Sequence, residues 1–433
     1  MTTERVGPAA RVDGSVTVPG DKSISHRALI IGALARGRSY IGNCSPAADV
    51  QSTITCLRMC GAWVREFGRG RIAIDGSGPG ESLRSPAAPL DCGNSGTPMR
   101  LLAGALAGHD VSATLDGDVS LRRRPMERVA EPLRTMGADV RTSNGSAPLV
   151  LQGASELRPV NWMLDVASAQ VKSAILLAAL SADGETSVTE PAPTRDHTER
   201  LLRACGVDVR TEATRVCVTP HDVQPFGVRV PGDISAAAFF LALAAARETW
   251  RIRCDGIGVN PGRTGIIEVL RAMGAEVSVE ETGAAAGVEP VADVAVQGRA
   301  LHGTVIEGAL TVRCVDEIPV ICVAATQADG TTVVRDASEL RRKESDRIGG
   351  IAAGLRAMGA TVDETEDGIA VRGPCRLRAA RLDARGDHRL AMAFAVAASL
   401  ADSTTGASQI EGAESASISD PAFFETLRSI TSR

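Results

Sequence analysis

Six segments of the chain have apolar residues on nearly every side of a helical projection. They are residues 26–35, 99–108, 171–182, 236–246, 318–328 and 389–401. A helix that is apolar all round must be covered by other elements. The pattern therefore predicts six buried helices.

A repeated phrase marks a second, amphipathic kind of helix. LRMCGAWV, LRTMGADV, LRACGVDV, LRAMGAEV and LRAMGATV begin at residues 57, 133, 202, 270 and 355, and a shortened LRSI begins at 427. Each full copy is typical of a last helical turn, a C-terminal Gly and a following strand. Short β-branched runs such as 15–18 and 330–334 are predicted strands. The repeats therefore indicate six α–β units with twelve helices.

The phrase VPGD divides these units into two groups. It occurs at residues 18–21 and 230–233, each time just before a predicted buried helix. A chain of 433 residues is long enough for two cores. We therefore predict an α/β protein with two similar domains of three units each, comprising residues 20–232 and residues 1–19 plus 233–433. The chain would cross between them near the two phrases.

Composition narrows the class of protein. The chain is 44% hydrophobic and 23% charged, which is typical of a folded soluble protein. A net charge of −5 argues against a general nucleic-acid binder. The N-terminal residues contain no apolar signal region, and no apolar run approaches the roughly 20 residues that span a bilayer. These features predict a cytoplasmic location.

The ten cysteines are scattered, and none forms a CxxC pair. Because cytosolic thiols normally stay reduced, buried thiols are predicted rather than disulfides. Cys56 and Cys60 could share a helix face and bind a metal, but no histidine or further cysteine lies nearby in sequence. They are interpreted as core residues.

Most of the unusual polar residues stand at the starts of the predicted buried helices. They are Lys22, Ser23, Ser25, His26, Arg27, Asn94, Ser95, Thr97, Ser168, Gln170, Lys172, Asp316, Glu317, Asp387, His388 and Arg389. A helix N-terminus presents free N–H groups and a partial positive charge, so several such helix starts in one place would form an anion site. The predicted ligand is anionic.

Ordinary structural roles are the alternative interpretation of these residues and their neighbours. The alternatives are N-caps for Ser95, Thr97 and Ser168, a capping pair for Asp196 and Glu199, a solvated turn for residues 122–124, and helix-surface pairs for Lys343, Glu344 and Arg347. The anion site is favoured because Lys, Arg and His accompany the possible caps at so many helix starts.

Well-known nucleotide and hydrolase motifs do not fit. GSVTVPGDKS is similar to a phosphate-binding P-loop, but Asp21 separates Gly20 from Lys22 and breaks its GK[ST] ending. The glycine-rich DGSGPGES has the wrong spacing for a dinucleotide fingerprint, and neither HExxH nor GxSxG occurs.

Seven motifs, in order, resemble the 5-enolpyruvylshikimate-3-phosphate synthase family over nearly the whole chain. They are GDKSISHR (20–27), GNSGTPMR (93–100), LRRRPM (121–126), SAQVKSA (168–174), TRDHTE (194–199), RKESDRI (342–348) and GDHRLAM (386–392). The resemblance implies two domains, each an inside-out α/β barrel of three βαβαββ units, with the active site in the interdomain cleft. It also implies a monomer that needs no metal or organic cofactor.

The implied reaction transfers the enolpyruvyl group of phosphoenolpyruvate to the 5-hydroxyl of shikimate 3-phosphate by addition and elimination, releasing phosphate. Motif by motif, the resemblance assigns proton transfer to Lys22, Asp316 and Glu344. It assigns shikimate 3-phosphate binding to Lys22, Ser23, Arg27, Ser168, Ala169, Gln170, Arg195, Asp316 and Lys343. It assigns phosphoenolpyruvate binding to Lys22, Asn94, Gly96, Arg124, Gln170, Arg347, His388 and Arg389.

Two departures from the family pattern bear on substrate binding. Many members have a second serine where this chain has Ala169, and many have a lysine in the segment matching SASISDPAFF (415–424). A third position bears on inhibition. Resistant members of a similar subgroup carry alanine where this chain has Gly96, so we expect the herbicide glyphosate to compete with phosphoenolpyruvate.

Three other functions are weighed against this resemblance. The enolpyruvyl transferase that acts on UDP-N-acetylglucosamine has asparagine after its lysine and often a loop cysteine, whereas here Ser23 follows Lys22. No cysteine lies between Cys92 and Cys205. An RNA 3′-phosphate cyclase-like protein would need a basic surface with stacking aromatics, but aromatic residues make up 3% of the chain. A non-catalytic binding protein would not need Lys22, Asp316 and Glu344 together.

Overall fold

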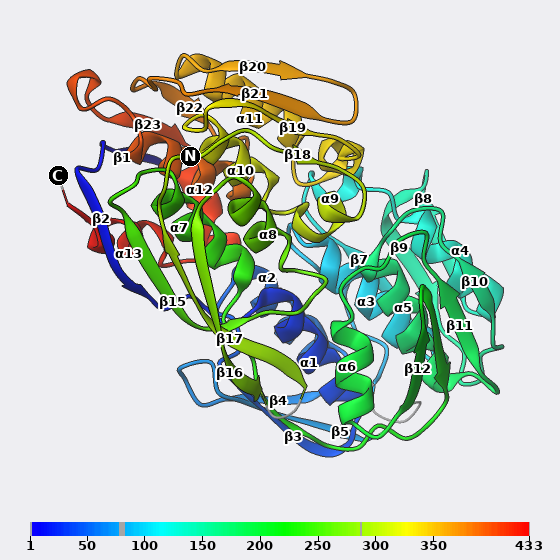
Figure 1. Ribbon diagram of the computed structural model, residues 1–433. Helices are drawn as coiled ribbons and strands as arrows, with labels where there is room; N and C mark the ends of the chain where they lie inside the picture. The colour runs from blue at the N-terminus through cyan, green and yellow to red at the C-terminus, as the bar shows by residue number, and fades with distance from the viewer. Residues whose placement is uncertain (1, 78–82, 286–287, 433) are drawn as a thin grey trace. The chain divides into compact units, whose positions relative to one another are not determined.

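The computed structural model describes residues 2–77, 83–285 and 288–432. The chain forms two compact units (Figure 1). Unit 1 comprises Met1–Pro19, Gly232–Gly283 and Pro290–Arg433, and unit 2 comprises Gly20–Pro231 and Ala284–Glu289. The main boundaries thus fall inside the two VPGD phrases. The short segment that unit 2 takes from the second half of the chain was not anticipated from the sequence.

The described part of unit 2 contains three buried helices, three amphipathic helices and three sheets of four strands. The buried helices are α1 (Lys22–Leu34), α3 (Gly96–Ala107) and α5 (Ala169–Ala178), and the amphipathic helices are α2 (Ala48–Met59), α4 (Glu127–Met136) and α6 (His197–Ala204). The sheets, in spatial order, are β14 (Gly227–Arg229), β3 (Arg36–Gly42), β5 (Ile72–Ser77) and β4 (Trp63–Glu66); β6 (Leu90–Asp91), β7 (Ser112–Asp116), β9 (Ser146–Gln152) and β8 (Asp139–Ser143); and β10 (Asn161–Met163), β11 (Thr186–Thr189), β13 (Arg215–Thr219) and β12 (Asp208–Glu212).

Unit 1 repeats this plan with variations. Its buried helices are α7 (Ile234–Ala245), α10 (Ile318–Ala325) and α12 (His388–Ser399), and its other helices are α8 (Gly265–Ala272), α9 (Ala309–Cys314), α11 (Arg347–Ala357) and α13 (Phe423–Ile430). Its sheets are β18 (Val305–Ile306), β19 (Gly330–Val334), β21 (Ile369–Gly373) and β20 (Thr361–Glu364); β16 (Glu276–Ala285), β17 (Glu289–Gln297), β15 (Arg251–Gly258), β2 (Arg11–Val16) and β24 (Thr431–Ser432); and β1 (Thr3–Val6), β23 (Ser408–Glu411) and β22 (Arg381–Asp383).

The four-stranded sheets share one topology. In each, the first pair of strands is parallel and the other two pairs are antiparallel. In unit 1 the N-terminal strand β2 lies parallel to β15, with Val16 opposite Cys254, so the start of the chain completes a sheet of the second half (Figure 1). Over the residues that the structure describes, the molecule is a mixed α/β protein with six small sheets.

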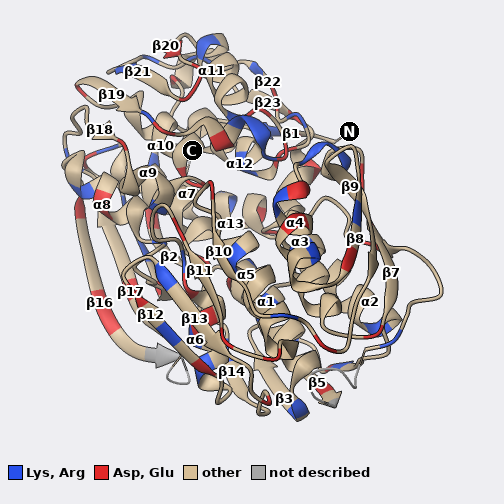
Figure 2. Ribbon diagram, turned by 90° about the vertical axis from the view of Figure 1, so that its right-hand side faces the viewer, with Lys and Arg blue, Asp and Glu red and all other residues tan. Residues whose placement is uncertain are grey.

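Close packing explains why the buried helices are rich in small apolar residues. A Cβ atom at Gly104 of α3 would lie 2.2 Å from the carbonyl oxygen of Ala174 in α5, so any larger residue would force these helices apart. Helices α7 and α10 carry no charged residue and are tan throughout in Figure 2. Such helices gain their stability from burial of apolar surface rather than from surface ion pairs.

The structure confirms the twelve predicted helices and adds the six-residue helix α9. The strand predicted at 15–18 is wrong in its bounds, because β2 begins at Arg11 and ends at Val16. All ten cysteines are free thiols, and Cys56 and Cys60 are fully buried in the core as predicted. Among the residues that the structure describes, no helix is both long and apolar enough to cross a membrane.

Candidate active site

The start of α1 places a lysine beside a carboxylate in unit 2. Asp21 is the N-cap of the helix, where its side chain accepts a hydrogen bond from the Ile24 N–H at 2.9 Å. The next residue, Lys22, holds its Nζ atom 3.1 Å from Oδ2 of Asp49, and its side chain is 14% exposed. The cap thus fixes the backbone that presents the Lys22 ammonium group.

One turn later, Arg27 is held from three sides. Its guanidinium donates to the carbonyl of Ser23 at 2.9 Å, to Oγ1 of Thr198 at 2.8 Å and to Oγ of Ser173 at 2.9 Å. Burial, together with the nearby charge of Arg195, lowers the pKa of Arg27 to about 10. The side chain stays charged at neutral pH, and its geometry is fixed before any ligand binds.

A second arginine, Arg124, precedes α4 in the chain and contacts the loop before α3. An Nη2 proton of Arg124 is donated to Oδ1 of Asn94 at 2.6 Å, and the Asn94 amide donates to Oδ2 of Asp118 at 2.5 Å. Arg124 is 6% exposed, whereas Arg122 in the same run is exposed and pairs with Asp116. The interpretation of residues 122–124 as a solvated turn therefore fails for Arg124, which is buried.

Arg100 is a buried arginine that the sequence reasoning did not single out. It donates to Oε1 of Gln170 and, at 3.1 Å, to the carbonyl of Pro125, and the Gln170 amide donates to Oγ1 of Thr97 at 2.8 Å. Arg100 therefore orients Gln170. Its place as the last residue of GNSGTPMR was the available signal.

The capping interpretation holds for one of these helix starts and fails for the others. Ser168 is the N-cap of α5 and accepts from the Val171 N–H at 3.4 Å. Ser95 and Asp196 occupy N-cap positions without a side-chain capping bond, and the Asp196 carboxylate instead pairs with Arg200. Glu199 is not a capping partner, since its carboxylate lies 2.7 Å from the Nζ atom of Lys172.

In unit 1, Arg347 is surrounded by three carboxylates. Its guanidinium lies 2.9 Å from Oδ2 of Asp387, 3.1 Å from Oδ1 of Asp316 and 2.5 Å from Oε2 of Glu344. These carboxylates raise the pKa of Arg347 despite its burial, and the residue is 1% exposed. The interpretation as a helix-surface pair is therefore wrong for Arg347, because the helix start is covered.

A polar cluster beside Arg389 was also missed as a set. Arg389 donates to the carbonyl of Ser235 at 3.2 Å, while the Ser235 hydroxyl donates to Glu317 and accepts from Arg263. Burial raises the pKa of the Glu317 carboxyl. These hydrogen bonds fix the start of α7, whose Ser235 carbonyl accepts from Arg389 at the start of α12.

The chain has only three lysines, and all of them lie in the motif segments. Besides Lys22, these are Lys172, which is paired with Glu190 and Glu199, and Lys343, whose pKa is lowered by burial. Arginine supplies every other fixed cation. Lysine can lose its proton near neutral pH when buried and arginine cannot, so the two kinds of cation are not interchangeable at these positions.

The predicted site residues thus fall into two half-sites, one in each unit. Unit 2 carries Lys22, Ser23, Arg27, Asn94, Gly96, Arg124, Ser168, Ala169, Gln170 and Arg195. Unit 1 carries Asp316, Lys343, Glu344, Arg347, His388 and Arg389. Each half-site has cations at helix starts, namely Lys22 at the start of α1 in unit 2, and Arg347 and Arg389 at the starts of α11 and α12 in unit 1.

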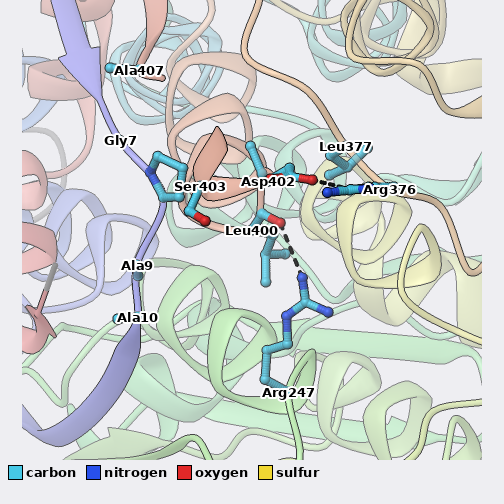
Figure 3. Close-up of a pocket in the computed structure, with 12 residues that line it drawn as sticks. Gly7, Ala9, Ala10, Arg247, Arg376, Leu377, Leu400, Asp402, Ser403 and Ala407 are labelled. Atoms are coloured by element: carbon cyan, nitrogen blue, oxygen red, sulfur yellow. Dashed lines mark hydrogen bonds and ion pairs between the residues drawn. The ribbon is translucent and has the colours of Figure 1, made fainter. Parts of the chain in front are cut away.

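A cavity of about 700 Å³ in unit 1 lies elsewhere (Figure 3). Its polar groups are engaged: Arg247 donates to the carbonyl of Leu400 at 3.2 Å, and Arg376 pairs with Asp402. Leu400 follows the C-terminal end of α12, whereas Arg389 is at its start, a helix length of about 16 Å away. The cavity is therefore not part of either half-site.

His26 in α1 gives a testable pH dependence of stability. Burial and the charges of Lys22 and Arg27 hold the pKa of His26 well below its usual value of 6.5, while its Nδ1 lies 2.7 Å from Oγ1 of Thr53. The unfolded chain therefore binds a proton first as the pH falls, so stability is lost below about pH 6.5, by up to about 1.4 kcal/mol per pH unit. Urea denaturation from pH 7 to 5 should show a shallower loss in His26→Asn than in the wild type.

The exposed His221 offers a matched control. His221→Asn should keep the wild-type slope, and His109, whose pKa burial also lowers, should keep part of the slope in both variants. Equal slopes for wild type and His26→Asn would contradict the assignment.

A solved EPSP synthase structure from Acinetobacter baumannii superposes with a TM-score of 0.87 at 40% identity, covering 99% of this chain and 98% of that one. The enolpyruvyl transferase NikO from Streptomyces tendae shares the fold, with a TM-score of 0.79 at 18% identity and coverage of 98% and 96%. The fold and the cation-rich helix starts therefore place this protein in the class of enolpyruvyl transferases.

Sequence comparison is more specific. The model of the family "EPSP synthase (3-phosphoshikimate 1-carboxyvinyltransferase)" matches residues 6–427. The 3-phosphoshikimate 1-carboxyvinyltransferase of Geobacillus kaustophilus is 48% identical, covering 96% of this chain and 97% of its own, and that of Acidithiobacillus ferrooxidans is 49% identical, covering 93% and 92%. The chain belongs to this family. Its activity is that of a 3-phosphoshikimate 1-carboxyvinyltransferase, a transferase of aromatic amino acid biosynthesis.

Proposed function

We propose that the two half-sites together bind phosphoenolpyruvate and shikimate 3-phosphate, the two substrates that the family activity implies. The observation that carries this proposal is the set of covered cations at helix starts in both units. Each substrate has a phosphate and a carboxylate, and fixed guanidinium groups bind such groups bidentately. The active site lies in the cleft between two inside-out α/β barrels, which close around the substrates.

In this proposal phosphoenolpyruvate binds to Lys22, Asn94, Gly96, Arg124, Gln170, Arg347, His388 and Arg389. The hydrogen bonds from Arg124 to Asn94 and from Arg100 to Gln170 support the assignment, because they orient two of these side chains in advance. Preorganised donors stabilise developing charge without a cost of reorganisation during the reaction.

Shikimate 3-phosphate binds in the same proposal to Lys22, Ser23, Arg27, Ser168, Ala169, Gln170, Arg195, Asp316 and Lys343. The fixed guanidinium of Arg27, next to the start of α1, supports this assignment. The methyl group of Ala169 offers no hydrogen bond to the phosphate, so Ser168 and the arginines supply the contacts.

The proposed mechanism has two proton-coupled steps. In the addition, the 5-hydroxyl oxygen bonds to C2 of phosphoenolpyruvate, loses its proton to a base and the C3 methylene gains a proton from an acid. In the elimination, C3 loses a proton, the double bond reforms and the C2–O bond to phosphate breaks. Lys22, Asp316 and Glu344 carry these protons, and Arg347 fixes the two carboxylates.

Phosphate release by the purified protein tests the proposed function. Release should require both substrates. Folded protein that releases no phosphate with both present would refute the proposal, and the next acceptor to test would be UDP-N-acetylglucosamine. The proposal includes a monomer that acts in the cytoplasm without a metal or organic cofactor, which sedimentation and assays with a chelator would check.

Gly96 gives a prediction about inhibition by glyphosate. A Cβ atom at this position would lie 2.6 Å from Nη1 of Arg100, which orients Gln170. We expect the added methyl group in Gly96→Ala to crowd glyphosate and to raise its inhibition constant at least about tenfold. The shift of Arg100 should raise the KM for phosphoenolpyruvate less, because a misplacement of about 1 Å costs at most about 10²-fold. Competition assays at several phosphoenolpyruvate concentrations measure both.

Ala103→Gly, in the same helix but fully buried in the core, serves as the comparison for a change of one methyl group. It should leave both constants within about twofold, since it touches no site residue. A Gly96→Ala enzyme with unchanged glyphosate inhibition would show that the steric account is wrong.

A further inference from the structure

The first turn of α6 is anchored by three different parts of unit 2. Its consecutive residues His197, Thr198 and Glu199 are each at most 2% exposed. Successive positions on a helix point in directions about 100° apart, so three buried neighbours in a row mean that the helix start is enclosed.

Each of the three residues has a polar partner from another element. Thr198 accepts the hydrogen bond from Nε of Arg27 in α1, and Glu199 lies 2.7 Å from Nζ of Lys172 in α5. Nδ1 of His197 lies 2.7 Å from Oε1 of Glu289, and both of these side chains are 2% exposed. The TRDHTE motif therefore contains three anchoring residues that follow Arg195 in the sequence.

Glu289 comes from the second half of the chain. It is the first residue of β17, yet it belongs to the short segment counted with unit 2. Its carboxylate also acts on the cations near this helix start, since it partly opposes the lowering of the pKa of Arg27. A buried carboxylate costs several kcal/mol unless it is paired, so its position calls for a specific partner.

We propose that Glu289 and His197 are positioning residues for the shikimate 3-phosphate subsite. The pair fixes the start of α6, and that turn presents Arg195 immediately before it and Thr198, which holds Arg27. Neither residue touches the substrate. This inference rests on the proposed function, because it assigns Arg27 and Arg195 to the phosphorylated acceptor.

A purely structural role would stabilise the fold without affecting one substrate more than the other. The positioning role predicts a selective effect, since Arg27 and Arg195 are assigned to shikimate 3-phosphate alone. Apart from Lys22 at the start of α1, which is assigned to both substrates, the cations assigned to phosphoenolpyruvate lie outside α1 and α6. A structural role therefore predicts similar changes in the KM of both substrates. The positioning role predicts a larger change in the KM of shikimate 3-phosphate than in that of phosphoenolpyruvate.

The experiment measures shikimate 3-phosphate binding by calorimetry, without phosphoenolpyruvate, and steady-state constants for both substrates. Glu289→Gln removes the charge, and His197→Phe removes the N–H group that faces Glu289. Both should weaken shikimate 3-phosphate binding about tenfold or more, with the KM for phosphoenolpyruvate within about threefold. His197→Asn, which keeps a side-chain N–H group, should stay within about threefold of wild type.

Glu185→Gln is the matched control, because Glu185 forms an exposed pair with Arg210 in the same unit. It should leave both substrates unaffected. Shikimate 3-phosphate affinity within twofold of wild type in folded Glu289→Gln, or equal losses for both substrates, would overturn the proposal. If Glu289→Gln does not fold, His197→Phe decides, and failure of both to fold would assign the pair to stability alone. An inactive wild type that binds no shikimate 3-phosphate would instead refute the proposed function.

Discussion

Replacing Lys22 by alanine is expected to lower the rate of phosphate release by about 10²- to 10⁴-fold, the usual contribution of a general acid or base. Lys22 is one of three lysines in the chain, and its ammonium group stands beside Asp49 at the start of α1. The loss should appear in kcat, because the proton is needed in the transition state. A phosphate-release assay with both substrates saturating measures it.

Lys22→Arg separates charge from proton transfer. Arginine keeps the positive charge but does not give up a proton at neutral pH. We therefore expect Lys22→Arg to bind phosphoenolpyruvate better than Lys22→Ala and yet to remain at least about 10²-fold slower than wild type. An arginine variant with near-wild-type kcat would show that Lys22 acts through its charge, and the proton would then be assigned to Asp316 or Glu344.

Replacing Arg347 by methionine is expected to destabilise the protein by about 3–5 kcal/mol, the usual cost of removing one partner from a buried ion pair. The guanidinium is 1% exposed and contacts the carboxylates of Asp316, Glu344 and Asp387. Without it these carboxylates repel one another in a poorly solvated place. The free energy of unfolding from urea denaturation measures the loss at pH 7.

The cost should shrink at low pH in Arg347→Met, because protonation of the carboxylates removes their repulsion. Arg356→Met is the matched control. Arg356 lies 3.1 Å from Glu364, but its side chain is 43% exposed, so its loss should cost less than about 1 kcal/mol. Equal losses of unfolding free energy in the two variants would show that the three carboxylates around Arg347 do not repel one another appreciably when that residue is absent.

The helices were predictable because their signals are local. The all-apolar segments and the Leu-Arg-x-x-Gly phrase each lie within about a dozen residues, the range over which helical periodicity and C-terminal glycines act. Helix α9 was not predictable in this way, since its six residues span too few turns to show a period. The end of β2 was missed because β-branched residues favour a strand but do not determine where pairing stops.

The candidate site was predictable as a set of residues and not as an arrangement. The order of the motifs is enough to propose Lys22, Arg124 and Arg347 as functional residues. Their partners were out of reach, because Arg100 and Gln170 are 70 residues apart and Arg347 and Asp387 are 40 residues apart. A contact between residues so distant in sequence depends on how whole elements pack.

The sequence by itself determined which segments are helices, which of them are buried, and which family the motifs resemble, because periodicity and motif spelling are properties of the chain. Tertiary structure alone decided the partners of the buried charges. The placement of Glu289 against His197, and of three carboxylates around Arg347, follows from packing, since a buried charge is tolerated only where other elements bring its counter-charge.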